Sequence, residues 1–270
     1  MNDKSESSRT LVELLQSRPT EDNSVDVSVV VPAFNEERRL PPTLIDIIDH
    51  VESQPLSWEV IVVDDGSSDG TSEVVRKFER LWRHVRLIRT PLNHGKGHAV
   101  RTGVLNSRGQ IIIFADADGS CPFAEMERLR NCLEQGADVA IGSRAVHSSD
   151  TRVVTRWHRK LMGRVFNLCV NRLLLPGISD TQCGFKMFRA DAAKFLFERQ
   201  RAQRYSFDVE ILFIARKAGL QVAEVPINWN IVGGSKVNLW VDSLRMLRDI
   251  FIFRLRHAGI TPADFSKNKE

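Results

Sequence analysis

Ile111-Ile-Ile-Phe-Ala-Asp-Ala-Asp-Gly-Ser120 is the stretch that decides the fold. Its apolar start, Ile111 to Phe114, predicts a buried strand, and two carboxylates follow where that strand ends. Side chains two residues apart on an extended chain point the same way, so Asp116 and Asp118 face one side. Carboxylates together with substrate phosphate oxygens are the ligands that Mg²⁺ prefers, and the pair therefore predicts a site for Mg²⁺ or Mn²⁺. A polar turn closed by Gly119 would explain the same residues, so the rest of the chain has to decide.

Composition narrows the class of protein. The 270 residues carry a net charge of +4, which suits an anionic partner such as a phosphorylated substrate or a membrane surface. Nucleic acid is not expected, because aromatic residues are only 7% and no nucleic-acid motif is present. No stretch approaches about 18 consecutive apolar residues, the length of a membrane span. The cysteines lack metal-ligand spacing and predict free thiols in a reducing compartment: Cys121, Cys132, Cys169 and Cys183.

Strands and helices alternate through the first half of the chain. This order predicts an α/β fold with a Rossmann-like, mostly parallel sheet and helices on both faces. Residues 1–24 are polar and predict a flexible arm. The expected strands are 25–31, 58–63, 85–89, 111–114 and 138–141, and the expected helices include 41–53 and 123–134.

Polar residues follow the ends of these strands, at the edge where open α/β sheets bind ligands. Asp64 and Asp65 end the second strand and are candidates for hydrogen bonds to a base or a ribose. Glu36 follows the first strand, although it may equally serve a helix entry. Lys96 lies in a glycine-rich loop that is no Walker A motif, and it is a candidate phosphate contact.

The second half of the chain is more basic and amphipathic. A long basic helix is predicted over 152–175 and includes Arg159, and a glycine-rich loop carries Lys236. A short strand follows residue 186, with helices at 190–198 and 207–218 and a strand at 221–225. The last helix, 237–257, carries an apolar stripe that either docks on the sheet or meets a partner or bilayer surface: Trp240, Leu244, Leu247, Phe251 and Leu255. Further apolar residues at 250, 252 and 253 favour the partner or bilayer.

These motifs together resemble the family 2 glycosyltransferases with the GT-A fold. The resemblance rests on Val30-Val-Pro-Ala-Phe-Asn-Glu36, Val63-Asp-Asp-Gly-Ser67, Ala115-Asp-Ala-Asp118 and Gly142-Ser-Arg144. Asp180-Thr-Gln-Cys-Gly-Phe-Lys186 and Phe207-Asp-Val-Glu210 make the chain most similar to the dolichyl-phosphate β-glucosyltransferases and other polyprenyl-phosphate sugar transferases.

The resemblance implies an inverting transfer of a hexose, glucose from UDP-glucose, onto a polyprenyl phosphate of dolichyl or undecaprenyl type. It implies catalytic roles for Asp116, Asp118 and Arg144, with a divalent metal on the two aspartates. The implied substrate contacts are Pro32, Phe34, Glu36, Asp64, Asp65, Lys96, Arg159 and Lys236. Eukaryotic members of the family carry an N-terminal membrane anchor, and this chain shows a polar arm instead.

We therefore expect a cytoplasmic enzyme attached peripherally to the cytoplasmic membrane. Its expected parts are the arm 1–24, a GT-A domain 25–232, and an acceptor loop with a membrane-surface helix over 233–270. Two alternatives remain open: a glycosyltransferase with a saccharide or protein hydroxyl as acceptor, and a nucleotide-sugar-binding protein without catalysis. A hydroxyl acceptor would require a carboxylate base, for which Asp208 is the candidate.

Overall fold

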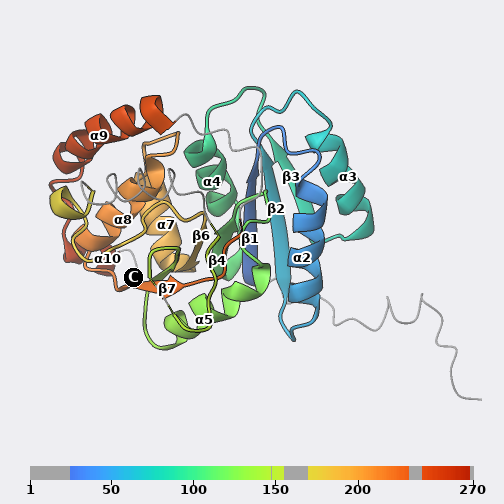
Figure 1. Ribbon diagram of the computed structural model, residues 1–270, viewed down its shortest axis with the longest axis horizontal. Helices are drawn as coiled ribbons and strands as arrows, with labels where there is room; N and C mark the ends of the chain where they lie inside the picture. Colours follow the sequence, from blue (N-terminus) through green and yellow to red (C-terminus); the bar gives the residue numbers. More distant parts are fainter. Residues whose placement is uncertain (1–24, 147, 155–169, 231–238, 268–270) are drawn as a thin grey trace, which may run out of the picture.

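The computed structural model describes residues 25–146, 148–154, 170–230 and 239–267 (Figure 1). The arm 1–24, most of the basic helix with Arg159, and the loop with Lys236 lie outside these residues. Within the described residues no helix is both long and apolar enough to cross a membrane. Cys121, Cys132 and Cys183 are free thiols, as expected.

A single seven-stranded sheet forms the centre of the molecule, in the order β3-β2-β1-β4-β6-β5-β7. All neighbouring strands are parallel except β6, which is antiparallel to both β4 and β5. The strands are β1 (Val25–Ala33), β2 (Trp58–Asp64), β3 (Val85–Arg89), β4 (Gly109–Ala115), β5 (Val139–Ser143), β6 (Phe185–Arg189) and β7 (Val222–Pro226).

Helices cover both faces of this sheet. On one face, apolar side chains of α2, α3 and α5 join a core with the inward residues of the strands. On the other face, a second core is built by α4, α7, α8, α9 and α10. The helices are α2 (Leu40–Glu52), α3 (Thr71–Leu81), α4 (Lys96–Leu105), η1 (Phe123–Glu125), α5 (Met126–Glu134), α7 (Ala190–Arg199), α8 (Phe207–Lys217), α9 (Leu239–Arg256) and α10 (Pro262–Ser266).

Two local predictions were wrong. The first strand was expected to break at Pro32, but β1 continues to Ala33. Its ladder with β4 ends at Val30, so Pro32 lies where only β2 is paired with β1, and proline tolerates such a position. The basic helix was expected to begin at Arg152, but Val153 instead forms an isolated bridge with Trp229. That bridge gives the backbone here an extended partner in place of a helical turn.

The predicted apolar stripe of the last helix does not dock on the core at its two described positions, whereas two residues that were expected to favour a partner or bilayer do. Phe251 and Leu255 belong to the predicted stripe, and they are 62% and 81% exposed. The docking residues are Ile250 and Phe253, which are both 2% exposed and pack into the second core. Apolar residues surround this part of the helix, so periodicity alone could not select the face that docks.

Candidate active site

Asp116 lies just beyond β4 and is held from two sides. Its backbone N–H donates to the carbonyl of Gly184 at 3.0 Å, and its carboxylate pairs with Nζ of Lys96 at 2.6 Å. An added Cβ at Gly184 would lie only 2.0 Å from Oδ2 of Asp116, so a larger residue there would displace that carboxylate. Burial lowers the pKa of Lys96, but the charges of Asp116 and Asp208 outweigh it and raise that pKa above its usual value. The cation is therefore fixed beside Asp116.

Asp118 lies two residues further on, in the turn that follows β4. Its Oδ1 accepts the N–H of Ser120 at 3.0 Å, and its Oδ2 lies 4.0 Å from Nη1 of Arg39. Burial and the nearby Asp116 raise the pKa of Asp118. Asp116 and Asp118 therefore form a site whose negative charge a bound cation would relieve.

Glu36 is linked to this pair through Arg39. Both carboxylate oxygens of Glu36 accept from the Arg39 guanidinium, at 2.6 and 2.5 Å. Arg39 thus bridges the loop after β1 and the pair after β4. Arg39 was not predicted as a site residue, because an arginine at a helix entry looks like an ordinary surface residue.

A buried ion pair lies behind the aspartates. Nζ of Lys186 is 2.5 Å from Asp208, with side chains 0% and 3% exposed, and it also donates to the carbonyl of Cys183 at 2.5 Å. The ammonium groups of Lys186 and Lys96 lie 5.3 and 6.0 Å from the ring centroid of Phe114. Asp208 is therefore buried, and its negative charge is paired with the ammonium group of Lys186.

Arg144 follows β5 and is clamped by Asp180. Its guanidinium donates to the two oxygens of Asp180 at 2.7 and 2.9 Å, and its backbone N–H donates at 3.0 Å. Burial alone would raise the pKa of Asp180, but Arg144 outweighs it and lowers that pKa. The ring of Trp229 lies 5.0 Å from the Arg144 guanidinium. Glu224 fixes the clamp by accepting the N–H of Asp180 at 2.7 Å.

A small cavity of about 10 Å³ joins these parts. Its lining includes Asp116, Gly184 and Trp229, so the aromatic partner of Arg144 and the first aspartate border the same space. The cavity has room for about one water molecule. Asp116 and the aromatic partner of Arg144 therefore lie close together.

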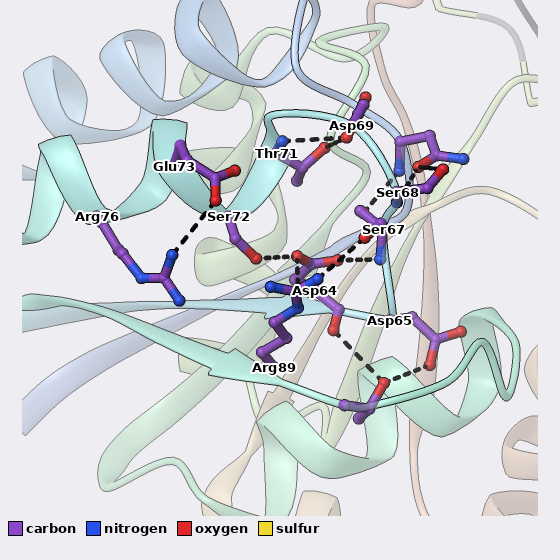
Figure 2. A network of polar contacts seen from close by, with 12 residues as sticks. Asp64, Asp65, Ser67, Ser68, Asp69, Thr71, Ser72, Glu73, Arg76 and Arg89 are labelled. Carbon is purple, nitrogen blue, oxygen red and sulfur yellow. Dashed lines mark hydrogen bonds and ion pairs between the residues drawn. The ribbon is translucent and has the colours of Figure 1, made fainter.

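The two aspartates at the end of β2 accept hydrogen bonds from other groups of the protein. Figure 2 shows Asp64 beside Ser67 and Ser72, whose backbone N–H and hydroxyl donate to it, respectively. Asp65 accepts the N–H of Gly95 at 2.6 Å and that of His94. The two carboxylates are 0% and 2% exposed, so they hold the loop after β2 and the start of α4 in place.

The loops after β1 and β2 are tied together. Asn35 has a φ of 53°, in the left-handed region that few residues other than glycine adopt. Its side-chain oxygen accepts the N–H of Ser68 at 2.8 Å, and its own N–H donates to Ser67 at 2.8 Å. Such strain recurs at binding sites. Pro32 is buried and Phe34 half-buried at the start of this loop.

The structure therefore brings together most of the predicted residues. Lys96 pairs with Asp116, and Arg39 connects Glu36 to Asp118. Trp229, the aromatic partner of Arg144, borders the cavity beside Asp116. Arg159 and Lys236 lie outside the described residues. The functional neighbours that the sequence analysis missed are Arg39, Asp180, Gly184 and Glu224. Of these, Asp180 and Gly184 belong to a quoted motif, Asp180 to Lys186, which was the available signal.

A divalent metal fits the two aspartates. Among the described residues no three His, Cys, Asp or Glu side chains are grouped as a metal site. Two carboxylates suffice, however, for Mg²⁺ that takes its other ligands from water and substrate phosphates. Asp116 and Asp118 would hold the ion.

The sheet order, with one antiparallel strand beside β4 and the paired aspartates at the end of β4, is the arrangement expected for the GT-A fold. The profile of glycosyl transferase family 2 matches residues 28–197. The protein belongs to this family.

Its relatives narrow the comparison. It is 38% identical over 244 residues to the human dolichyl-phosphate beta-glucosyltransferase, covering 86% of this chain and 75% of the relative. The Saccharomyces cerevisiae dolichyl-phosphate beta-glucosyltransferase is 36% identical over 256 residues, covering 88% and 76%. The solved structure of glucosyl-3-phosphoglycerate synthase from Mycobacterium tuberculosis with Mn²⁺, UDP and glucosyl-3-phosphoglycerate has a TM-score of 0.62 at 21% identity, covering 87% and 81%. The predicted GT-A fold is confirmed.

Proposed function

We propose that the protein is an inverting glucosyltransferase that moves glucose from UDP-glucose onto the phosphate of a polyprenyl phosphate at the cytoplasmic side of a membrane. The observation that carries the proposal is the identity of 34–40% with dolichyl-phosphate beta-glucosyltransferases over most of the chain. The described active-site residues supply a donor side and an acceptor side that fit this reaction.

On the donor side, Asp116 and Asp118 would hold Mg²⁺ or Mn²⁺, and a bound ion would supply positive charge beside the departing UDP. Uridine lies between the loops after β1 and β2, against Pro32, Phe34 and Glu36. Asp64 and Asp65 shape that pocket, since their oxygens already accept hydrogen bonds from the chain. Lys96 is placed to contact the diphosphate, because its ammonium pairs with Asp116.

On the acceptor side, an ionised phosphate is already a nucleophile and needs positioning rather than a base. Arg144, oriented by Asp180, presents a cation for it, and Arg159 and Lys236 add two more. Asp208 is a poor base for a hydroxyl acceptor, because it is 2% exposed and paired with Lys186. Direct attack of the phosphate oxygen on the anomeric carbon, with UDP leaving from the opposite side, gives inversion.

A transfer assay with matched acceptors tests the proposal. UDP-glucose labelled in the sugar is incubated with a short-chain polyprenyl phosphate, or with the polyprenol that lacks the phosphate. We expect lipid-linked glucose only with the phosphate, and only with Mg²⁺ or Mn²⁺. Transfer to the polyprenol, or to a saccharide at a comparable rate, would favour a hydroxyl acceptor. UDP binding without transfer to any acceptor would favour a non-catalytic protein.

Arg159→Ala separates acceptor from donor contacts in the same assay. Loss of one charged contact costs about 1.5–3 kcal/mol. We expect acceptor efficiency to fall about 10- to 150-fold while UDP affinity stays nearly constant. Asp118→Ala is the matched donor-side variant, and should abolish transfer with the fold intact.

A further inference from the structure

One side of α9 combines exposed apolar and basic residues next to a hollow. The helix lies at the periphery of the molecule beside α8, on the opposite side from α3 (Figure 1). Ile250 and Phe253 face inward, as described above. Arg248 and Arg256 are exposed, and Phe251 and Leu255 adjoin them one helical row away.

The hollow lies between this face and the loop that precedes α8. It has a volume of about 400 Å³, in the range of small-ligand sites. Its charged lining consists of four arginines and one aspartate: Arg201, Arg204, Arg248, Arg256 and Asp249. Asp249 accepts from the Ser206 hydroxyl at 2.7 Å and pairs with Arg248 at 3.2 Å. Arg256 lies 3.9 Å from the buried Glu210. The four arginines still outnumber these two carboxylates, so a surplus of positive charge remains.

We propose that this hollow binds the phosphate of an anionic phospholipid, and that Phe251 and Leu255 insert into the same bilayer. Arginine grips phosphate through its planar fork, and four arginines around one hollow complement an anionic headgroup. An apolar pair exposed by 62% and 81% beside those arginines is the composition of a helix that lies in a membrane interface. The phospholipid at this hollow is distinct from the acceptor phosphate proposed at Arg144.

The position of the hollow suits the proposed reaction. Its loop also contacts the first turn of α4, because the N–H of His98 donates to the carbonyl of Gln203 at 3.0 Å. That turn carries Lys96. A bilayer docked at the hollow therefore lies beside the turn of α4 that carries the active-site residue Lys96. Only the link between the docked bilayer and the active site rests on the proposed function, because headgroup binding does not require sugar transfer.

Vesicle flotation tests the proposal on the full chain. Vesicles of phosphatidylcholine alone are compared with vesicles that also contain phosphatidylglycerol. Arg204→Gln combined with Arg248→Gln should lower partitioning into the anionic vesicles about 30-fold, from the typical contribution of each arginine near such a surface. The control, Arg76→Gln with Arg80→Gln, removes the same charge from exposed positions on α3 and should change partitioning by less than about threefold.

Leu255→Gln gives a second comparison, with Leu81→Gln as its control, because these leucines are 81% and 72% exposed. Only the change in α9 should release the protein from vesicles. Equal effects of variant and control, or a wild-type protein that ignores anionic vesicles, would overturn the proposal.

A transfer assay with a short-chain acceptor in solution distinguishes a headgroup phosphate site at the hollow from the acceptor phosphate site. The Arg204/Arg248 variant should keep the wild-type KM for this acceptor. A raised KM would assign the hollow to the acceptor and overturn the phospholipid assignment. If the wild-type protein transfers no sugar, the proposed function fails, and flotation alone still decides the headgroup site.

Discussion

Replacing Gly184 by alanine tests the metal site through a residue that supplies no side-chain ligand. The new Cβ would lie 2.0 Å from Oδ2 of Asp116, whereas ordinary contact begins at 3.4 Å. The carboxylate must therefore move by about 1.4 Å, the difference between these two values. Metal–ligand distances in proteins are held to within about 0.2 Å. We expect metal-dependent UDP binding to weaken by about 10- to 150-fold, taking a charged contact as worth about 1.5–3 kcal/mol.

The fold should survive this substitution. The Asp116 side chain is 27% exposed and can turn outward, at an expected cost of about 1 kcal/mol in unfolding free energy. Calorimetry of UDP binding in the presence of Mn²⁺ measures the loss of UDP affinity. The electron paramagnetic resonance signal of free Mn²⁺ measures the loss of metal affinity. Gly259→Ala is the matched control, because nothing lies within 4 Å of its added Cβ. Wild-type Mn²⁺ and UDP affinities in the Gly184 variant would refute the assignment of Asp116 as a ligand in this position.

Three further predictions concern acid stability, the buried ion pair and the donor. Arg144 lowers the pKa of Asp180 against the effect of burial, so this carboxylate stabilises the fold above about pH 4, and the contribution is lost as the pH falls below that value. In urea unfolding, Asp180→Asn should therefore lose less stability than the wild type on acidification; an unchanged acid limb would contradict this. Asp208→Asn leaves Lys186 buried without a matching charge and should lower the unfolding free energy by about 3 kcal/mol, while turnover at saturating substrates stays within about tenfold if no base is needed. A loss of several orders of magnitude in turnover, with UDP affinity preserved, would instead indicate a hydroxyl acceptor. Calorimetry with metal should show UDP binding more tightly than GDP, and Asp65→Ala should weaken it because two loop amides lose their acceptor; equal affinity for both nucleotides would remove the basis for a UDP-sugar donor.

Local sequence patterns predicted most elements of the fold. The β-branched run after residue 24 and the apolar run before Asp116 are long enough to identify as strands, and both are found close to the expected bounds. The direction of β6 could not be predicted in this way. Phe185–Arg189 is a five-residue strand, and periodicity carries no information about which neighbours it pairs with or in which direction.

The site was predictable where its residues follow strand ends, and less so where partners come from distant segments. Asp116 and Asp118 are separated by one residue in the sequence, and they interact electrostatically in the structure. Asp180 reaches Arg144 across 36 positions, so the clamp appears only when the sheet is assembled. The roles of Asp64 and Asp65 also depend on neighbours, because carboxylates free to bind a ligand look the same in sequence as carboxylates that hold a loop.

The placement of β6 has a consequence for the growing chain. Synthesis delivers β4 long before β6, yet β6 is the strand that covers the outer edge of β4 and links it to β5. Until about residue 189 has left the ribosome, the apolar edge of β4 has no sheet partner on that side. An mRNA truncated between the codons for β5 and β6 would therefore yield a protein that contains β1 to β4 but leaves one edge of β4 unpaired and open to association with other chains. We expect such fragments to be recovered in aggregates rather than in the soluble fraction.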